Sequence, residues 1–475
     1  KEDNVKEDKY DGAYVKDPLT GMHKWVVSFD INSLYPHLIM QYNISPEKII
    51  GVKSSGISVA KLLKQQTPLS HLKTEGACIT PNGAMFKNDK PGFLPRLLEK
   101  MYNDRVKFKT MAFQAKQEYQ KTKDKELTKK IATYHNIQWA KKISLNSAYG
   151  AIGNQYFRYY DVRQATAITT SGQFVIRFIE NKVNEYMNNI LKTHDKVDYI
   201  VASDTDSIYL TLDKLVEATC KDKPVEHILR FINKVVDSRI QPFLDKCFAE
   251  LADYTNAIGN KMVMKREVIA DKGIWTAKKR YMLNVLDEEG IVYENPKLKI
   301  MGIEAVKSST PEVCRGKIKE AINLIMTKDQ DTLQKFVADF RTEFEQMSAE
   351  QISFPRSCNN LAKYRHANDV FIKGTPIHVK GALIYNHQIQ QYKLGNKYPL
   401  IQEGDKIKFV KLVEPNPFKF DVISYITKLP KEFKLDDYID HDTMFQKTFL
   451  DPLSFILNSI GWSYEKKASL EAFFE

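Results

Sequence analysis

A long stretch in the first third of the chain contains neither proline nor glycine. Between Pro95 and Gly150 the sequence is instead dense in Lys, Gln, Glu, Leu and Met, which are good helix formers. A polar break near residues 122–125 divides this stretch. It therefore predicts two helices that run antiparallel and project from whatever precedes them.

Strand signals surround this predicted helical pair. An apolar run over residues 25–31 ends in a carboxylate and predicts a buried strand, followed by a short helix over 34–42. Further patterns predict a hairpin over 76–87 around Pro81-Asn82-Gly83, a helix over 164–192, two strands over 197–212, and strands over 262–303 with a turn at 287–290. The pattern is mixed after about residue 305, and we place a domain boundary near 304. The 475 residues correspond to about three domains.

The charge balance predicts a polyanionic partner. The chain has 71 Lys and Arg against 59 Asp and Glu, a formal net charge of +12. Nucleic acid is the first candidate and an anionic membrane surface the second. Surplus lysines that are merely solvated are the alternative.

Several classes of protein are excluded by the composition. Hydrophobic residues make up 43% and charged residues 27%, as in ordinary globular proteins. No apolar run has the length of a membrane span, and no signal-peptide pattern opens the chain. The five cysteines are scattered, which excludes a recognisable zinc module and a disulfide framework and fits a reducing cytoplasm.

Two acidic sites stand at predicted strand ends that are far apart in the sequence. Asp30 closes the first strand, and Asp204 and Asp206 lie between the apolar flanks of the 197–212 pair. Two carboxylates that are two residues apart on an extended strand point to the same side and repel, unless a cation lies near them. Asp30 with Asp206 would suit Mg²⁺, and two such ions can promote phosphoryl transfer. An Asx turn that caps a hairpin is the alternative for the Asp-x-Asp pattern.

Four motifs occur in an order that resembles the family B DNA polymerases. They are D-I-N-S-L-Y-P (30–36), K-x-x-x-N-S-x-Y-G (142–150), D-T-D-S (204–207) and K-K-R-Y (278–281). Other segments, including N-I-S-P-E (43–47), F-R-Y-Y-D (157–161), K-L-K-I-M-G (297–302) and E-K-K-A-S-L (465–470), look like the T-even-type bacteriophage replicative polymerases. Ser203 departs from the family, because most members have Gly before D-T-D-S. A serine there requires ordinary backbone angles and leaves the acids untouched.

The resemblance implies a metal and nucleotide site around the first acids. Asp30 and Asp206 would hold two Mg²⁺ ions, for which Mn²⁺ could substitute, with the carbonyl of Ile31 as a further ligand and Asp204 nearby. The N–H groups of Ser33, Leu34 and Tyr35 would cradle the triphosphate, as free donors at a strand-to-helix turn can. Tyr35 would also block a ribose 2′-OH; simple packing against Pro36 is the alternative.

The resemblance also assigns residues of the predicted helical pair to the nucleotide. Lys142, Asn146, Tyr149 and Gly153 recur at intervals that place them on one helical face. That face would close on a nucleotide and a base pair, with Lys142 among the catalytic residues. Arg105 and Lys109 match positions that grip the triphosphate, the arginine as a fork and the lysine as a point charge. A solvated basic face is the alternative for these two.

Other matched positions imply contacts with DNA and with a sliding clamp. Along a strand, the K-K-R-Y segment would send Lys278 and Arg280 to one side and Lys279 and Tyr281 to the other, against the primer end. Tyr10 and Gly12 resemble a motif that contacts the template, and Glu267 matches a carboxylate near the metals. The last residues resemble a clamp-binding tail, with Leu470, Phe473 and Phe474 as its apolar contacts; docking of this tail on the protein itself is the alternative.

We therefore expect an α+β, right-hand polymerase that adds deoxynucleotides to a primer 3′-OH in DNA replication. The expected domains are an antiparallel-sheet palm (1–93 and 156–303), helical-hairpin fingers (94–155) and a mixed, largely helical thumb (304–475). We expect no 3′–5′ exonuclease domain in the chain, a separate exonuclease chain as a possible partner, no membrane, and the cytoplasm (of a host cell, if viral) as location. The alternatives are another metal-dependent nucleotidyltransferase, such as an RNA-templated one, or a DNA-binding subunit without catalytic activity.

Overall fold

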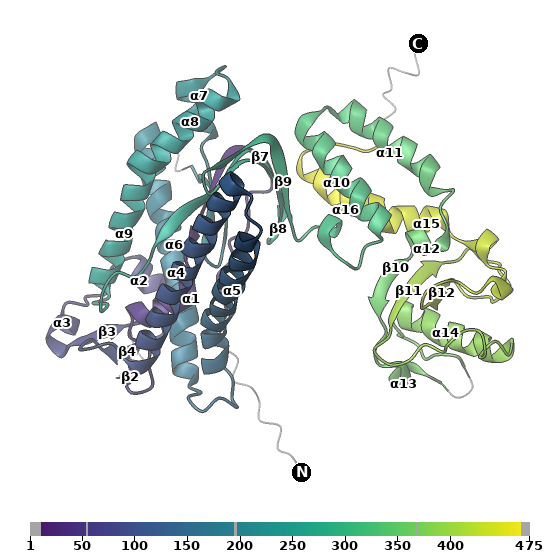
Figure 1. The fold of residues 1–475 in the computed structure, drawn as a ribbon, viewed down its shortest axis with the longest axis horizontal. Coiled ribbons are helices and arrows are strands. Elements are labelled where there is room, and N and C mark those ends of the chain that lie inside the picture. The colour runs from purple at the N-terminus through teal and green to yellow at the C-terminus, as the bar shows by residue number, and fades with distance from the viewer. Residues whose placement is uncertain (1–10, 54–55, 194–196, 367–368, 467–475) are drawn as a thin grey trace. The chain divides into compact units, whose positions relative to one another are not determined.

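The computed structural model describes residues 11–53, 56–193, 197–366 and 369–466, and the chain divides into two compact units. Unit 1 contains the chain up to Leu19, His23–Asp271 and Leu286–Glu294. Unit 2 contains Thr20–Met22, Lys272–Val285 and the chain from Asn295 onward. Figure 1 labels many of the elements of both units, and each unit has its own buried apolar core.

The largest sheet has six strands in the order β5-β6-β1-β7-β8-β9. Their bounds are β1 Gly21–Ile31, β5 Ile200–Asp204, β6 Ser207–Thr211, β7 Met264–Ala277, β8 Arg280–Glu288 and β9 Ile291–Met301. Strand β6 pairs antiparallel with both β5 and β1. The boundary between the two units falls within β7, β8 and β9.

The helices of unit 1 pack around this sheet and a smaller one. The smaller sheet has the order β2-β4-β3, with β2 Ile49–Val52, β3 Ala77–Ile79 and β4 Ala84–Lys87. The shorter helices are α1 Leu34–Gln41, α2 Val59–Leu63, α3 His71–Glu75, α7 Asp213–Cys220, α8 Val225–Val235 and α9 Gln241–Tyr254, with a π-helical turn at Val236–Ile240. The expected hairpin over 76–87 is confirmed as β3–β4.

Helix α6, Val162–Leu191, forms the centre of the core of unit 1. The apolar stripe that predicts it is buried throughout, and Phe174, Val175 and Ile179 have no exposed surface. Burial of one such phenylalanine contributes roughly 1.5–3 kcal/mol. Because α6 contacts α1, α5, β5 and β6, it supports the strands that carry the acidic residues.

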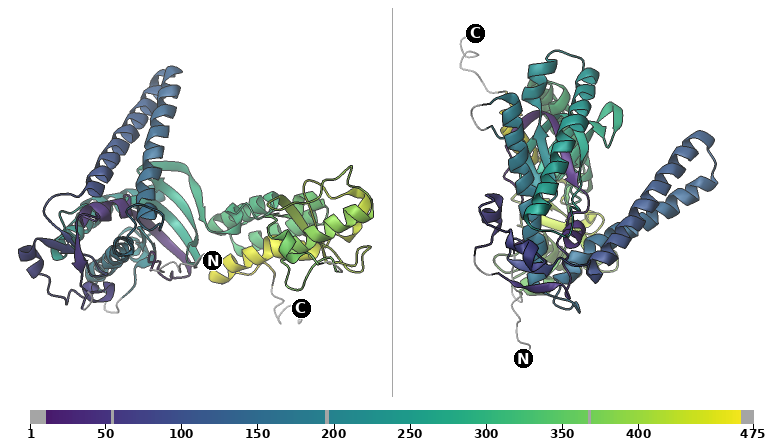
Figure 2. Two further views of the ribbon diagram at one scale, coloured as in Figure 1. Left: turned by 90° about the horizontal axis from the view of Figure 1, so that it is seen from below. Right: turned by 90° about the vertical axis from the view of Figure 1, so that its left-hand side faces the viewer.

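The predicted helical pair is confirmed as α4, Phe93–Thr122, and α5, Glu126–Ile152. Figure 2 shows the two helices side by side, extending away from the sheet of unit 1. Lys123 ends α4 in a left-handed conformation, and the side chain of Asp124 accepts a hydrogen bond from the N–H of Glu126. An ion pair of 2.8 Å between Lys141 Nζ and Asp104 Oδ2 joins the helices further along.

Side chains of the segment N-I-S-P-E hold the first turn of α4. The N–H of Gly92 donates to Asn43 Oδ1 and the N–H of Phe93 to Glu47 Oε1, both at 2.7 Å. The N–H of Leu94 lies 3.4 Å from Ser45 Oγ. These N–H groups have no acceptor within the helix itself, so the segment caps α4 from a distance.

Unit 2 is a helical unit with a small sheet, β10-β11-β12. Its strands are β10 Phe354–Ser357, β11 Lys406–Lys411 and β12 Val422–Tyr425. Its helices are α10 Glu312–Thr327, α11 Gln330–Phe344, α12 Ala349–Ile352, α13 Leu361–Tyr364, α14 Ile377–Gln391, α15 His441–Phe445 and α16 Asp451–Ser459, with 3₁₀ turns at Glu304–Val306, Lys431–Phe433 and Asp436–Tyr438 and a π-helical turn at Gln446–Leu450. Helix α14 packs on β12.

Three other expectations from the sequence can be compared with the structure. All five cysteines are free and buried, so no disulfide framework is present. The K-K-R-Y segment does not lie along one strand: Lys278 and Lys279 form the turn between β7 and β8, and only Arg280 and Tyr281 begin β8. The turn is possible because Lys279 adopts a φ of 61°. None of the described helices is long and apolar enough to cross a membrane.

The contact of α14 with β12 predicts opposite effects of one substitution at two helical glycines of unit 2. A Cβ atom at Gly381 would lie 2.5 Å from Ser424 Oγ and 2.8 Å from Ser424 N, whereas one at Gly316 on α10 would meet nothing within 4 Å. Gly381→Ala should therefore lower the free energy of unfolding by roughly 1–3 kcal/mol. Gly316→Ala should raise it by roughly 0.5–1 kcal/mol, because alanine favours the helix. Urea denaturation measures both, and equal effects would contradict the described packing.

Candidate active site

The two predicted acidic sites lie at the same end of one sheet, with Asp30 near the end of β1 and Asp206 in the turn that leads into the adjacent β6. In the β1–β6 ladder Asp30 is the partner of Ser207, and the N–H of Ile31 donates to the carbonyl of Asp206 at 2.8 Å. The chain turns between β5 and β6 at Thr205, whose φ is 58°. The turn places Asp204 and Asp206 on either side of this residue. Strand pairing thus places Asp30 beside a turn distant in sequence.

Helix α1 begins directly after β1 at a residue with unusual backbone geometry. Its N-cap, Ser33, has a φ of 49° and makes no side-chain hydrogen bond to the helix. Instead its hydroxyl accepts a hydrogen bond of 3.1 Å from Nη1 of Arg105 on α4. The start of α1 and the first half of α4 are therefore joined next to the acids.

His37 packs against this junction of α1 and α4. The side chain is buried, its Nδ1 lies 3.0 Å from the carbonyl oxygen of Ser33, and its ring contacts that of Tyr102 edge-on. Burial lowers the pKa of His37; the hydrogen bond to Ser33 opposes this, and the charges of Lys261 and Arg105 lower the pKa further. The ring is thus neutral near pH 7 and adds no positive charge beneath the turn.

A cavity of about 1150 Å³ lies over the acids within unit 1. Asp30 lines it from β1, Thr205 and Asp206 line it from the β5–β6 turn, and Asn32 to Pro36 line it from the start of α1. The two long helices supply a cationic wall, with Arg105 and Lys109 from α4 and Lys142 and Asn146 from α5. The structure therefore places carboxylates and cations of three of the four motif regions in one cavity, and no residue of the K-K-R-Y segment lines it.

Arg105 has a buried donor that no described residue satisfies. Its Nε atom is buried and has no hydrogen-bond partner among the described residues, although its Nη1 binds Ser33. A buried donor without a partner is costly unless a ligand satisfies it. Since the residue lines the cavity, a ligand with anionic oxygens fits this position best.

Tyr35 and Tyr149 meet at the side of the cavity. Their ring centroids are 4.7 Å apart, and Tyr35 lines the cavity. Behind Tyr35 lies Gly172 of α6, where a Cβ atom would come within 3.2 Å of Tyr35 Cε1. The absence of a side chain at 172 leaves room for the Tyr35 ring in this position.

The donor set fits a magnesium site. Asp30 and Asp206 line the same cavity, and Glu267, matched in sequence to a nearby carboxylate, lines it too. Within the described residues no three His, Cys, Asp or Glu side chains gather closely enough to hold a metal on their own. Mg²⁺ usually takes only one or two carboxylates and completes its shell with water and substrate phosphate oxygens, so the pair is sufficient.

Sequence reasoning missed several residues that line this cavity. Trp139 of α5 is half exposed, and the ammonium group of Lys142 lies 5.3 Å from its ring centroid, a cation–π contact. The others are His135, Gln138, Val106, Tyr102, Val236, Asp237, Gln241, Lys265, Arg266 and Glu289. Helical spacing from Lys142 could have indicated Trp139, Gln138 and His135; the rest depend on tertiary packing.

The remaining predicted site residues lie elsewhere or outside the described residues. Arg280 forms a two-pronged ion pair with Glu304, at 3.1 and 2.7 Å, and the buried Tyr281 stacks on Trp275. The exposed Gly12 accepts a hydrogen bond from Gln173 through its carbonyl, and Gly153 caps the C-terminus of α5. Tyr10, Leu470, Phe473 and Phe474 lie outside the described residues.

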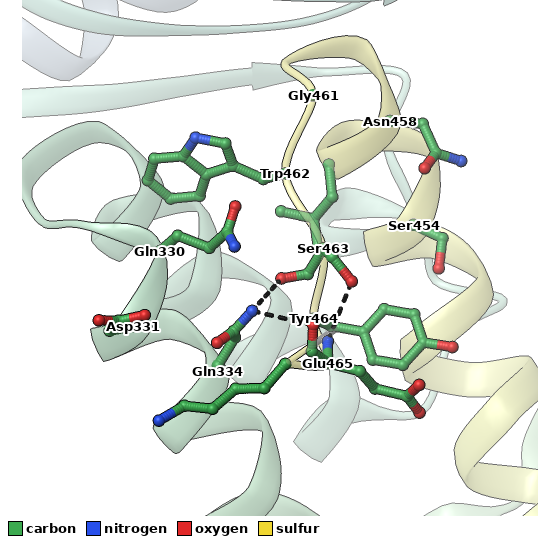
Figure 3. Close-up of a pocket in the computed structure, with 12 residues that line it drawn as sticks. Gln330, Asp331, Gln334, Ser454, Asn458, Gly461, Trp462, Ser463, Tyr464 and Glu465 are labelled. Carbon is green, nitrogen blue, oxygen red and sulfur yellow. Dashed lines mark hydrogen bonds between the residues drawn. The ribbon is translucent and has the colours of Figure 1, made fainter. Parts of the chain in front are cut away.

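A second hollow, of about 720 Å³, lies in unit 2 between α11, α16 and the segment 461–466 (Figure 3). The buried side-chain amide of Gln334 on α11 donates to the carbonyls of Ser463 and Glu465, each at 3.0 Å. Trp462 and Tyr464 add aromatic surface to the walls. Gln334 thus fixes the segment that leads into the predicted clamp-binding tail.

A mixed α and β protein with paired strand-end carboxylates facing a cationic helical wall is typical of phosphoryl-transfer enzymes. The model of DNA polymerase family B matches residues 1–252, and the chain belongs to this family. Over 98% of its length it is 35% identical to the protein named DNA-directed DNA polymerase of Escherichia phage RB69 and 34% identical to that of Enterobacteria phage T4. Over 66% of its length it is 28% identical to the DNA polymerase of Pyrococcus glycovorans, of which it covers 32%.

The comparisons confirm the family inferred from the four motifs. The chain covers 57% of the length of each of the two phage relatives. The roles of individual residues, the domain names and the expected lack of an exonuclease domain stay predictions.

The anchor at Gln334 predicts a local loss of stability. Gln334→Leu keeps the approximate volume but removes two hydrogen bonds, so the free energy of unfolding should fall by about 1–3 kcal/mol. Gln330→Leu, one turn earlier on the same helix, is the matched control and should change stability by less. Thermal and urea denaturation measure both variants. A larger loss at Gln330 would contradict the anchoring role.

Proposed function

We propose that the chain is the polymerase part of a DNA polymerase and adds deoxynucleotides to a DNA primer on a DNA template. The observation that carries this proposal is the cavity in which Asp30 and Asp206 face Arg105, Lys109 and Lys142. A nucleoside triphosphate needs both the carboxylates and the cations of such a site. Its phosphates carry charge that the cations balance, and the reacting oxygens lie close to the acids.

In the proposed mechanism Asp30 and Asp206, with the carbonyl of Ile31, would hold two Mg²⁺ ions, and Asp204 lies nearby. When bound, the ions would stabilise the charge on the attacking 3′-oxygen and on the leaving pyrophosphate. The side chains fix the place of this chemistry, because strand pairing determines where the two carboxylates stand.

The triphosphate would lie between α1 and the helical pair. Arg105 and Lys109 bind its oxygens, the former through the buried Nε that lacks a partner among the described residues. Lys142 and Asn146 approach from α5, and the N–H groups of Ser33, Leu34 and Tyr35 from the start of α1. Together they hold the α-phosphate in line with the primer end, which supplies much of the rate enhancement in phosphoryl transfer.

Selection of deoxynucleotides is assigned to Tyr35. The contact with Tyr149 and the lack of a side chain at Gly172 support this role, because they fix the position of the Tyr35 ring beside the cavity. A ribose 2′-OH would meet that ring, whereas a deoxyribose would not. An RNA-specific nucleotidyltransferase would have no use for this arrangement.

The finer assignments complete the proposal. Residues 94–155 act as fingers, 1–93 and 156–303 as palm, and 304–475 as thumb. Gly12, Gly153, Lys278, Lys279, Arg280 and Tyr281, with Tyr10, contact primer–template DNA, mostly through phosphates, so that binding is sensitive to salt. Leu470, Phe473 and Phe474 bind a sliding clamp, and replication takes place in the host cytoplasm.

The metal site predicts the effect of a nearly isosteric change. Asp206→Asn removes one charge and keeps the side-chain shape, so primer extension with Mg²⁺ should fall about a thousandfold or more. Single-turnover extension of a DNA primer measures it, with rNTPs in parallel reactions. The wild type should prefer dNTPs; a folded wild type that does not extend the primer would refute the proposed function.

The cationic wall predicts a specific loss of nucleotide affinity. Arg105→Ala should raise the KM for dNTP about 10- to 100-fold, the equivalent of roughly 1.5–3 kcal/mol for hydrogen bonds to charged groups. Lys107→Ala, an exposed position on the same helix, is the matched control. It changes the net charge equally and should leave the KM near the wild-type value. Equal effects would indicate a general charge effect instead of a binding contact.

A further inference from the structure

The residues just after Gly12 support the acidic turn, that is, the turn between β5 and β6 that carries Asp204 and Asp206. Residues 14–19 run along β5, the edge strand of the six-stranded sheet. The N–H of Leu19 donates to the carbonyl of Val201 at 2.8 Å and that of Lys16 to the carbonyl of Ser203 at 3.1 Å. Val15 forms a bridge with Asp204. The segment therefore follows the strand up to the acids.

The last of these contacts reaches the turn itself. The N–H of Thr205 donates to the carbonyl of Tyr14 at 3.0 Å. Thr205 has a φ of 58°, a conformation that β-branched residues rarely adopt. Such a residue persists only where its surroundings hold it. The position of Asp204 and Asp206 thus depends on how firmly residues 14–16 are held.

A buried ionic network holds them. Lys16 Nζ lies 2.8 Å from Glu180 Oε1 on α6 and 2.7 Å from Asp198 Oδ2, and only 11% of its side chain is exposed. Burial lowers the pKa of Lys16, but hydrogen bonds to Asp198 and Glu180 outweigh it, so the pKa is raised and the ammonium group stays charged. Asn184 Nδ2 donates to the other oxygen of Asp198 at 2.9 Å.

The network extends to the strand that carries the acids. The hydroxyl of Ser203, the residue directly before Asp204, donates to Glu180 Oε2 at 3.2 Å, and its side chain is buried. Glu180 therefore binds the ammonium group with one oxygen and the end of β5 with the other. Ser203 is the position at which the sequence departs from the glycine of most family members. In this chain the departure adds a bond from the strand end to α6.

We propose that Lys16, Glu180 and Ser203 are positioning residues that fix the turn carrying Asp204 and Asp206 and so set the metal affinity of the site. The inference rests on the proposed function. Lys16 also neutralises Glu180, which would otherwise place an unpaired carboxylate behind two others and oppose their common ionisation. None of the three residues lines the cavity. Their effect passes through the backbone of the turn.

The test uses the full chain with Mn²⁺ alone as the probe, followed by the electron paramagnetic resonance signal of the free ion. The difference in Mn²⁺ binding between the wild type and Asp206→Asn gives the part of the binding that depends on the acidic turn. Ser203→Ala and Lys16→Met should weaken this part about 10-fold, as is typical for residues behind metal ligands. Lys182→Met is the matched control, since Lys182 lies on α6, as Glu180 does, but pairs with Glu250 at 2.9 Å. It should bind Mn²⁺ as the wild type does.

Primer extension gives a second measurement. The variants should lower kcat and leave the KM for dNTP near the wild-type value, because the triphosphate contacts are untouched. Glu180→Gln keeps an acceptor for Ser203 but loses the charge, so it tests the network should Lys16→Met fail to fold. Folded variants with wild-type Mn²⁺ affinity and kcat would overturn the inference. Equal Mn²⁺ binding by the wild type and Asp206→Asn would instead refute the proposed metal site.

Discussion

The antiparallel pairing of β1 with β6 is the constraint on which the site depends. It places Asp30 beside the turn that carries Asp206, although the two residues are distant in the sequence. Carboxylates brought together in this way repel each other, which favours a cation between them. The sheet therefore concentrates negative charge at one end, which a divalent ion would balance under the proposed function. The core of unit 1, centred on α6, supplies the rigidity that keeps the carboxylates together.

The cationic wall of α4 and α5 places positive charge opposite the carboxylates. A triphosphate binds weakly to an acidic surface unless positive charges meet its outer oxygens. Arg105, Lys109 and Lys142 are carried by α4 and α5, which pack mainly against each other and also against α1. The net charge of +12 conceals this separation of opposite charges within one cavity.

Much of the fold could be predicted because its signals are local. The absence of proline and glycine predicts α4 and α5, and the apolar stripe predicts α6. The acids of the site were identified because each stands at the end of an apolar strand. The turn at Lys278 and Lys279 was missed, because its residues carry no turn signature and Lys279 adopts a positive φ. The bond of Ser203 to Glu180 was equally hidden, since nothing in either local sequence indicates the partner.

The cap that Asn43, Ser45 and Glu47 place on α4 has a mechanical consequence. Arg105 lies twelve residues beyond Phe93, so at 1.5 Å per residue the helix acts as a lever about 18 Å long. A tilt of about 5° at the base would displace Arg105 sideways by about 1.5 Å at that rise per residue. Such a displacement is large for a group that would bind phosphate oxygens under the proposed function. The three hydrogen bonds at the first turn of the helix, together with the bond of Arg105 to Ser33, therefore bear on how accurately Arg105 would be positioned against a nucleotide.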